Sequence, residues 1–375
     1  MAHALDAQGA ALRLVITGQH PGLNPTDHGF DRWPLLLLDC PGQADPDEHA
    51  TMLRHSLAPL LTRHPPELVM VQGDTSSAYG GALAAGEAGV ALAHVEAGLR
   101  THDPDQPWPE EGYRTAIDAM AELMFAPTSG NAANLAREQV MGEVHVTGNS
   151  GIDALDAEVR RLRLRPRGPW MRRFARGPLR LLVTCHRREN WGAGIERLAE
   201  ALGRLAERRV AQVSVVLHPN PLVSATLYRL LGDQPGITLL APLSHPAMLR
   251  ALAGADLALS DSGGLQEEAP ALGVPLLVLR DNTERPEGIA SGSMLLTGTD
   301  PDRLVEIVTR LDSDRGELAR MARPARPFGD GQSSPRIAAL ALGWIERQLT
   351  SPTPATIARG AGPAPPSPLN HGPFV

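Results

Sequence analysis

Short runs of apolar residues alternate with longer stretches of helical character through the first half of the chain. The runs cover residues 12–18, 68–74, 90–98, 123–128 and 144–149. Between them lie segments such as "TSSAYGGALAAGEAG", which have the composition of helices. Brief apolar runs, each followed by a helix, are typical of buried parallel strands joined by helical crossovers. The pattern therefore predicts an α/β domain with a parallel sheet.

The alternation starts again in the second half. Residues 159–180 carry nine arginines with prolines and glycines, and afterwards apolar runs return as "LRLLVTC", "VSVVLHP", "ITLLAP", "DLALSDS" and "PLLVLRD". We predict two doubly wound, Rossmann-like domains over residues 1–157 and 158–349, facing each other across a cleft, with the last helix packing back on the first domain. Residues 350–375 are rich in Pro, Ala and Gly, which predicts a disordered tail.

Charge and length narrow the classes of function. The 375 residues have a formal net charge of −7 and 42% apolar content, which suits globular domains without general attraction to nucleic acids or acidic membranes. The arginine-rich run at 159–180 could form a nucleic-acid patch, but in an acidic protein a solvated linker or helix face is the commoner explanation. The apolar run at 33–40 is too short to span a bilayer. We therefore expect neither nucleic acids nor membranes as partners.

The absence of lysine and the small number of cysteines exclude several kinds of site. Every basic residue is arginine, because the sequence contains no lysine, and this excludes Schiff-base chemistry and a P-loop lysine. Cys40 and Cys185 lie far apart and match no metal-ligand spacing. We expect no disulfide and no zinc site, and a cytoplasmic location fits best.

The residues that follow each predicted strand carry the chemical signal, because ligands of open parallel sheets bind beyond the carboxyl ends of the strands. At residues 261–264, two glycines would let the backbone approach a ligand, and Ser262 is placed to cap the next helix, whose first amides suit a phosphate. One of Glu267 and Glu268 is placed to accept hydrogen bonds from ribose hydroxyls. The turn therefore predicts a nucleotide site.

Other strand ends of the second half are also suited to anions. Arg280 and Arg285 follow one predicted strand and could neutralise a diphosphate through bidentate contacts. His186 follows another strand, with arginines beside it. Consecutive polar strand ends of this kind favour a diphosphate site over ordinary loops.

The first half presents carboxylates at the corresponding positions. Asp74 and Glu96 follow adjacent predicted strands, and Glu110, Glu111 and Arg114 come shortly after. Converging carboxylates raise the pKa of at least one of them, which lets a general acid and a general base coexist near neutral pH. A magnesium site is the alternative, although arginines could already balance the phosphate charge. A diphosphate site that faces such carboxylates suggests chemistry on a sugar of a nucleoside diphosphate, with domain closure.

With these motifs, the chain resembles the non-hydrolysing UDP-N-acetylglucosamine 2-epimerases, which share the two-domain GT-B fold of the B-type glycosyltransferases. The matching segments are "TGQH" (17–20), "VQGDT" (71–75), "HVEAGLRT" (94–101), "PWPEEGYR" (107–114), "FAPT" (125–128), "VTGNSGIDAL" (146–155), "CHRREN" (185–190), "HPNP" (218–221), "SDSGGLQEEAPALG" (260–273), "RDNTERPEG" (280–288) and "PFGDG" (327–331). They occur in family order over most of the chain.

The resemblance implies reversible inversion at C2 of UDP-GlcNAc to give UDP-ManNAc. In such enzymes a base removes the C2 proton and UDP leaves, and UDP and a proton then return to an enclosed 2-acetamidoglucal, with no metal or cofactor. The resemblance also implies a homodimer and activation by a second substrate molecule. By matching positions, it implies catalytic roles for Asp74, Glu96, Glu110, Arg114 and His186, UDP contacts from Ser262, Gly263, Gly264, Glu268, Arg285 and Met248, and activator contacts from Gln19 and Arg187 or Arg188.

Three departures from the family pattern stand out. The family opens with a strand and a "GTRPEAIK"-type loop, which has no counterpart here, so we expect the flanking strands to lack a central partner and turnover to be poor while UDP still binds. Tyr113 stands where the family usually has asparagine, and Met248 where an aromatic ring often stacks on uracil. Methionine can still cover a ring face.

Two rival functions fit much of the same sequence. A hydrolysing relative would release UDP and free ManNAc, and a non-catalytic protein would only bind the UDP-sugar. Separation of the products formed from UDP-GlcNAc distinguishes these outcomes.

Overall fold

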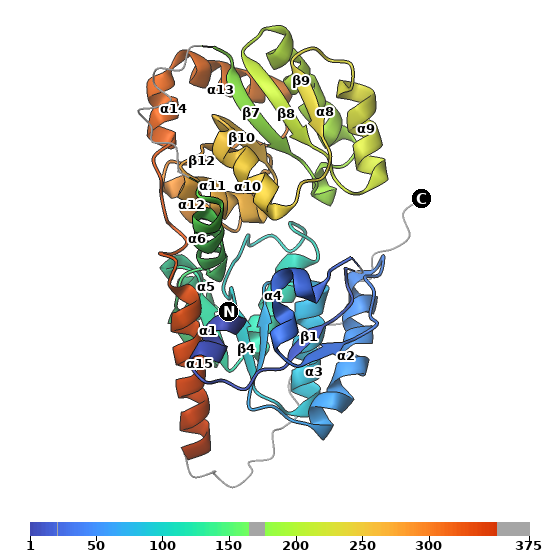
Figure 1. The fold of residues 1–375 in the computed structure, drawn as a ribbon, viewed down its shortest axis with the longest axis vertical. Helices are drawn as coiled ribbons and strands as arrows, with labels where there is room; N and C mark the ends of the chain where they lie inside the picture. Colours follow the sequence, from blue (N-terminus) through green and yellow to red (C-terminus); the bar gives the residue numbers. More distant parts are fainter. Residues whose placement is uncertain (21, 165–176, 351–375) are drawn as a thin grey trace.

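The computed structural model describes residues 1–20, 22–164 and 177–350 of the chain. Two α/β domains lie one above the other along the long axis of the molecule (Figure 1). All paired strands are parallel, as the alternating pattern predicted. Most of the arginine-rich run and the predicted disordered tail from residue 351 lie outside the described residues.

The second domain contains a six-stranded sheet in the order β12-β11-β10-β7-β8-β9. Its strands are β7 (Leu179–Thr184), β8 (Ala211–Val216), β9 (Ile237–Leu240), β10 (Leu257–Ser260), β11 (Leu276–Val278) and β12 (Met294–Leu296). Its helices are α8 (Ala193–Glu207), α9 (Pro221–Leu231), α10 (His245–Gly254), α11 (Gly263–Leu272), α12 (Pro286–Ala290), α13 (Pro301–Ser313) and α14 (Arg315–Met321). The chain reverses its direction across the sheet between β7 and β10, where such folds bind ligands.

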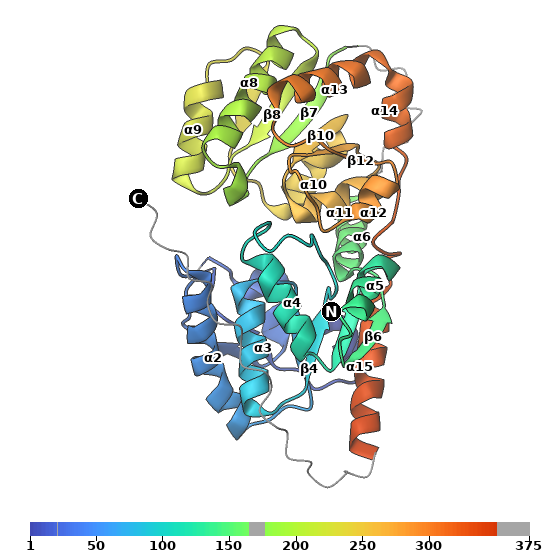
Figure 2. The same ribbon diagram turned by 180° about the vertical axis from the view of Figure 1, so that it is seen from behind.

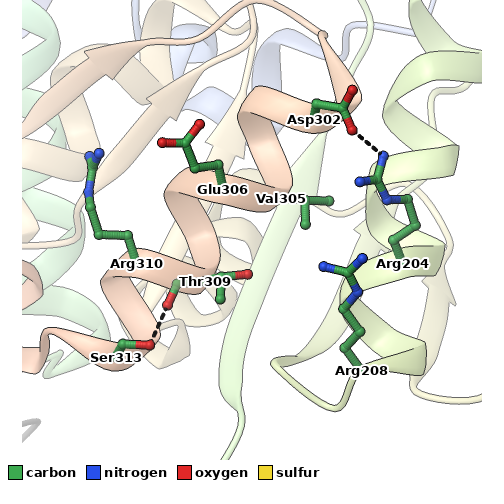
Figure 3. Close-up of a pocket in the computed structure, with 8 residues that line it drawn as sticks. All are labelled: Arg204, Arg208, Asp302, Val305, Glu306, Thr309, Arg310 and Ser313. Atoms are coloured by element: carbon green, nitrogen blue, oxygen red, sulfur yellow. Dashed lines mark hydrogen bonds and ion pairs between the residues drawn. The ribbon is translucent and has the colours of Figure 1, made fainter.

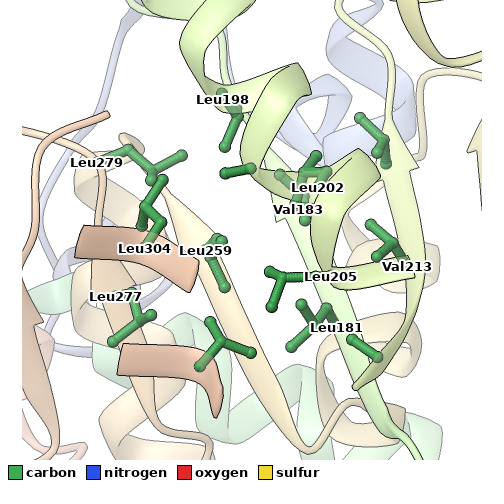
Figure 4. Packing of buried hydrophobic residues seen from close by; sticks show 14 of the residues in the cluster. Leu181, Val183, Leu198, Leu202, Leu205, Val213, Leu259, Leu277, Leu279 and Leu304 are labelled. Carbon is green, nitrogen blue, oxygen red and sulfur yellow. The ribbon is translucent and has the colours of Figure 1, made fainter. Parts of the chain in front are cut away.

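Hydrophobic side chains cover both faces of this sheet. On one face, Leu181, Val183 and other strand residues pack against Leu198, Leu202 and Leu205 of α8 (Figure 4). The other face packs against α10, α11 and the preceding α6 (Ser150–Leu162). Continuous apolar strands are the expected consequence of burial on two faces.

The first domain contains two separate sheets. A four-stranded sheet has the order β3-β4-β5-β6, and β1 pairs only with β2 in a sheet of two strands. The strands are β1 (Leu14–Ile16), β2 (Leu35–Leu37), β3 (Val69–Gln72), β4 (Leu92–Val95), β5 (Leu123–Ala126) and β6 (Glu143–Val146). The helices are α1 (Ala2–Ala7), α2 (Pro46–Arg63), α3 (Ser76–Ala88), α4 (Glu110–Met120) and α5 (Ser129–Arg137), with 3-10 turns at Pro25–His28 and Phe30–Arg32. Within the described ranges, no strand joins β1 to β3.

Two helices connect the domains. Ile152 and Leu155 of α6 belong to the core of the second domain, although α6 spans the proposed boundary at 157/158. The last helix, α15 (Ser333–Thr350), returns to the first domain, where Ile337, Ala341 and Trp344 pack against its four-stranded sheet. Both views show α15 beside the first domain (Figure 1 and Figure 2). Among the helices of the described residues, none is long and apolar enough to cross a membrane.

Candidate active site

A cleft of about 380 Å³ lies beyond the strand ends at the switch point of the second domain. Its lining includes His186 after β7, His218 after β8, His245 and Met248 on α10, and Ser262, Gly264 and Glu268 at the start of α11. The sequence had indicated Met248, Ser262, Gly264, Glu268 and His186. The structure therefore places these five residues in the lining of one cavity.

The structure separates the two adjacent glutamates of α11. Glu268 lines the cleft, and its Oε1 lies 2.7 Å from His245 Nε2. This hydrogen bond raises the pKa of His245. Glu267 is buried and its Oε1 accepts from Arg285 Nε at 2.7 Å. Glu268 is thus the carboxylate that a ligand in the cleft would meet.

The turn into α11 is shaped by its glycine and by a buried carboxylate. A Cβ atom on Gly263 would lie 3.0 Å from Arg285 Nη1, so glycine permits the close approach of the guanidinium. Ser262 occupies the N-cap position, but its side chain makes no capping hydrogen bond, contrary to the prediction. Asp261, which the sequence analysis did not select, is fully buried and accepts from the backbone nitrogens of His186 and Arg187 at 3.0 Å. It thereby fastens the loop after β7 to the α11 turn.

Arg285 connects this turn to the first domain. Its Nη2 lies 3.0 Å from Glu96 Oε1, and its Nη1 contacts Glu284. Burial would lower the pKa of Arg285, but Glu267, Glu284 and Glu96 raise it. Burial opposes ionisation of Glu284 as well, yet Arg285 and Arg280 hold its pKa below the ordinary value. Arg285 is therefore a permanent cation between the two domains.

Glu96 has an environment suited to proton transfer. Burial, followed by the negative charge of Glu267, raises its pKa to about 8. Its backbone is left-handed, with φ of 73°, which is uncommon for a residue with a side chain. A carboxyl group with this pKa is largely protonated at neutral pH and can act as an acid.

Of the other two candidate carboxylates, Asp74 pairs with Arg114 and Glu110 does not. Arg114 Nε donates to Asp74 Oδ2 at 3.0 Å, and its Nη1 donates to Glu111 Oε2 at 3.0 Å. Glu111 also accepts from two backbone amides of the preceding loop, at 2.9 and 3.0 Å, which is a structural role. Glu110 points elsewhere: within the described residues, its buried Oε2 has no hydrogen-bond partner. Burial raises the pKa of Glu110.

Two of the residues assigned to an activator site have different partners in the structure. Arg187 Nη1 lies 3.7 Å from Glu110 Oε1, so this arginine of the second domain meets the carboxylates of the first. Gln19 instead accepts a hydrogen bond from Ser77 on α3. The side chain of Arg188 lies outside the described part of the chain. The candidate site thus includes Arg187 and leaves Gln19 at its side.

A second hollow of about 350 Å³ lies on the outer surface between α8 and α13 (Figure 3). Its charged groups are largely paired, as Arg204 Nη1 lies 2.8 Å from Asp302 Oδ1 and Arg310 Nε 3.3 Å from Glu317 Oε2. None of the candidate site residues that follow the strands lines this hollow. In the described ranges, no group of three or more His, Cys, Asp or Glu side chains could hold a metal ion.

Comparison with known proteins identifies similar chains over nearly the whole length. A family model described as UDP-N-acetylglucosamine 2-epimerase matches residues 3–341. The UDP-N-acetylglucosamine 2-epimerase of Yersinia pestis is 40% identical over 349 residues, which cover 90% of this chain and 92% of that protein. A probable UDP-N-acetylglucosamine 2-epimerase of Ralstonia nicotianae is 41% identical over 335 residues, covering 86% and 89%.

Solved structures agree with these relatives. The UDP-GlcNAc 2-epimerase of Neisseria meningitidis bound to UDP-GlcNAc superposes with a TM-score of 0.82 at 32% identity, covering 92% of this chain and 96% of that one. The Methanocaldococcus jannaschii enzyme in complex with UDP-GlcNAc and UDP has a TM-score of 0.72 at 27% identity, with coverage of 88% and 100%. The predicted GT-B-like fold class is thereby confirmed.

Proposed function

Because this chain belongs to the UDP-N-acetylglucosamine 2-epimerase family of isomerases, we propose that it interconverts UDP-GlcNAc and UDP-ManNAc without releasing free sugar. The observation that carries the proposal is the position of Arg285. It touches the α11 turn at Gly263 and, 3.0 Å from its Nη2, the Glu96 carboxyl group of the other domain. A diphosphate bound by this arginine would hold its sugar beside the carboxylates.

The cleft of the second domain accounts for the nucleotide. Glu268 would accept hydrogen bonds from the ribose hydroxyls, and Met248 would cover a face of the uracil. The first amides of α11, at Gly263 and Gly264, and the guanidinium of Arg285 would bind the diphosphate. Arginine and backbone amides would thus neutralise the diphosphate charge without a lysine.

The carboxylates of the first domain would perform the chemistry. A base, for which Asp74 is our candidate, takes the proton from C2, the C–H electron pair forms the C1=C2 double bond, and the C1–O bond breaks as UDP leaves. UDP then adds again to C1 of the 2-acetamidoglucal, while an acid returns a proton to the opposite face of C2. Glu96 and Glu110, whose pKa values are raised, can hold that proton. Arg114 would supply positive charge, and His186 a hydrogen bond, beside the leaving group.

Product analysis tests the proposal. The chain is incubated with UDP-GlcNAc in deuterated water, and UDP-ManNAc, free sugar and UDP are separated over time. UDP-ManNAc with deuterium at C2, formed up to an equilibrium ratio, is the expected result. Accumulation of UDP with free ManNAc would establish the hydrolysing alternative, and binding without conversion would establish a UDP-sugar-binding protein. Asp74→Asn should abolish conversion, with Asp302→Asn on the outer surface as the matched control.

Assembly and regulation are part of the same proposal. We expect a homodimer in the cytoplasm, activated by a second substrate molecule near Gln19 and Arg187. Light scattering measures the oligomeric state. Sigmoidal dependence of rate on UDP-GlcNAc that becomes hyperbolic in an Arg187→Ala variant would indicate activation, and hyperbolic kinetics in the unchanged chain would refute it.

A further inference from the structure

A buried ionic cluster contacts the two turns that carry the candidate carboxylates Asp74 and Glu96. Asp118, on α4, is 1% exposed. Its Oδ1 lies 2.6 Å from His94 Nδ1, and its Oδ2 accepts from the backbone nitrogen of Gly98 at 3.1 Å and from Arg100 Nη2 at 2.8 Å. Arg100 in turn pairs with Glu138 at 2.6 Å. No residue of this cluster was assigned a role in the reaction above.

One arm of the cluster reaches the turn that carries Asp74. His94 Nε2 lies 3.0 Å from the carbonyl oxygen of Gly73. A carbonyl oxygen only accepts, so the ring donates to it, and the other ring nitrogen faces the Asp118 carboxylate. Asp118 therefore orients His94, and His94 holds the residue immediately before Asp74.

The other arm reaches the turn that carries Glu96. The Gly98 nitrogen, two residues beyond Glu96, donates directly to Asp118 Oδ2. A Cβ atom on Gly73 would lie 3.3 Å from Glu96 Oε2, so the two turns are in contact. Glu96 has a left-handed backbone, at φ of 73°, which persists only where surrounding bonds hold it. The Gly98 bond is one of these restraints.

The same helix completes the set. One turn before Asp118, Arg114 donates to Asp74 Oδ2 at 3.0 Å, and Glu110 begins the helix. All three candidate carboxylates are thus connected to α4. Asp118 provides this connection for the turns that carry Asp74 and Glu96. Displacements of about 1 Å in such a constellation can cost on the order of 100-fold in rate.

We propose that Asp118 is a positioning residue that, through His94 and the Gly98 amide, sets the spacing between Asp74 and Glu96 required for loss and return of UDP at C1 with proton exchange at C2. This inference rests on the proposed epimerase function. Asp118 would not contact the substrate. It would act by fixing the positions of the base, Asp74, and the acid, Glu96. UDP affinity, which the second domain supplies, should be independent of it.

Asp118→Asn is the direct test. The amide keeps the size of the side chain but has one accepting oxygen in place of two, so either the end that faces His94 or the end that accepts from the Gly98 amide and Arg100 loses its acceptor. We expect kcat to fall 10- to 100-fold, while the Kd for UDP by calorimetry changes less than threefold. We also expect more UDP released per UDP-ManNAc formed, because a misplaced acid lets the unsaturated intermediate escape. Wild-type kcat and wild-type UDP release in the folded variant would overturn the proposal.

Two further variants separate positioning from simple loss of stability. Glu138→Gln weakens the same ionic cluster at Arg100 but contacts neither turn, so it should lower the melting temperature and leave kcat unchanged. An equal fall in kcat for Glu138→Gln would refute the specific role of Asp118. If Asp118→Asn does not fold, His94→Gln, which alters only the Gly73 arm, decides by the same measurements. Absence of conversion by the unchanged chain would instead refute the epimerase function itself.

Discussion

Glu96→Gln should stabilise the protein while it removes activity. The Glu96 carboxyl group is buried beside Glu267, and its pKa rises from 4.5 to about 8. In the unfolded chain the group ionises above its ordinary pKa, whereas in the folded protein it keeps its proton until about pH 8. The folded state therefore binds more protons in this window, and its stability falls as the pH rises from 4.5 to about 8.

The size of the effect follows from the shift. Each pKa unit corresponds to about 1.4 kcal/mol, so ionisation of the unfolded chain lowers the stability of the native protein by about 3 kcal/mol at pH 7 and at most about 5 kcal/mol above pH 8. Glutamine resembles the protonated acid and ionises in neither state. The variant should match the native protein near pH 4 and exceed it by about 3 kcal/mol at pH 7.

Urea unfolding of both proteins at several pH values between 5 and 8 measures this difference. The stability gap should widen by about 1.4 kcal/mol per pH unit, and turnover should fall about 100-fold or more because the acid is lost. Glu306→Gln, an exposed exchange on α13, controls for the substitution itself. A gap that stays constant with pH, or a less stable Glu96→Gln protein at pH 7, would refute the buried, protonated state of Glu96.

Three further outcomes are expected. Gly263→Ala places a Cβ atom 3.0 Å from Arg285 Nη1, so UDP affinity measured by calorimetry should fall about tenfold. Gly203→Ala, with open space around its Cβ, is the control and should leave UDP affinity unchanged. Asp74→Asn and Glu110→Gln should each reduce turnover about 100-fold or more and leave UDP affinity intact; normal epimerisation by both would exclude a carboxylate mechanism. Exhaustive chelation should leave turnover unchanged, because arginines neutralise the diphosphate, and loss of activity restored by magnesium would contradict this.

Local sequence chemistry led to the strand ends that form the candidate site. The α11 turn, the arginine after β11 and the carboxylates after β3 and β4 were all selected because a parallel sheet presents its strand ends on one edge. Asp118 and Asp261 were not selected, because a single aspartate inside a helix or turn has no distinguishing pattern until its partners are known.

The sequence by itself determined the α/β class and indicated the segments that form the candidate site, because hydrophobic periodicity and turn chemistry act over a few neighbouring residues. Only the tertiary structure separated the two members of each adjacent pair. Glu268 lines the cleft while Glu267 accepts from Arg285, and Glu111 accepts from loop amides while the buried Oε2 of Glu110 has no hydrogen-bond partner among the described residues. Only the tertiary structure revealed the two ion pairs between the domains, Arg187 with Glu110 and Arg285 with Glu96. Ion pairs and pKa values depend on distance and burial between segments far apart in the chain, and no local pattern encodes those quantities.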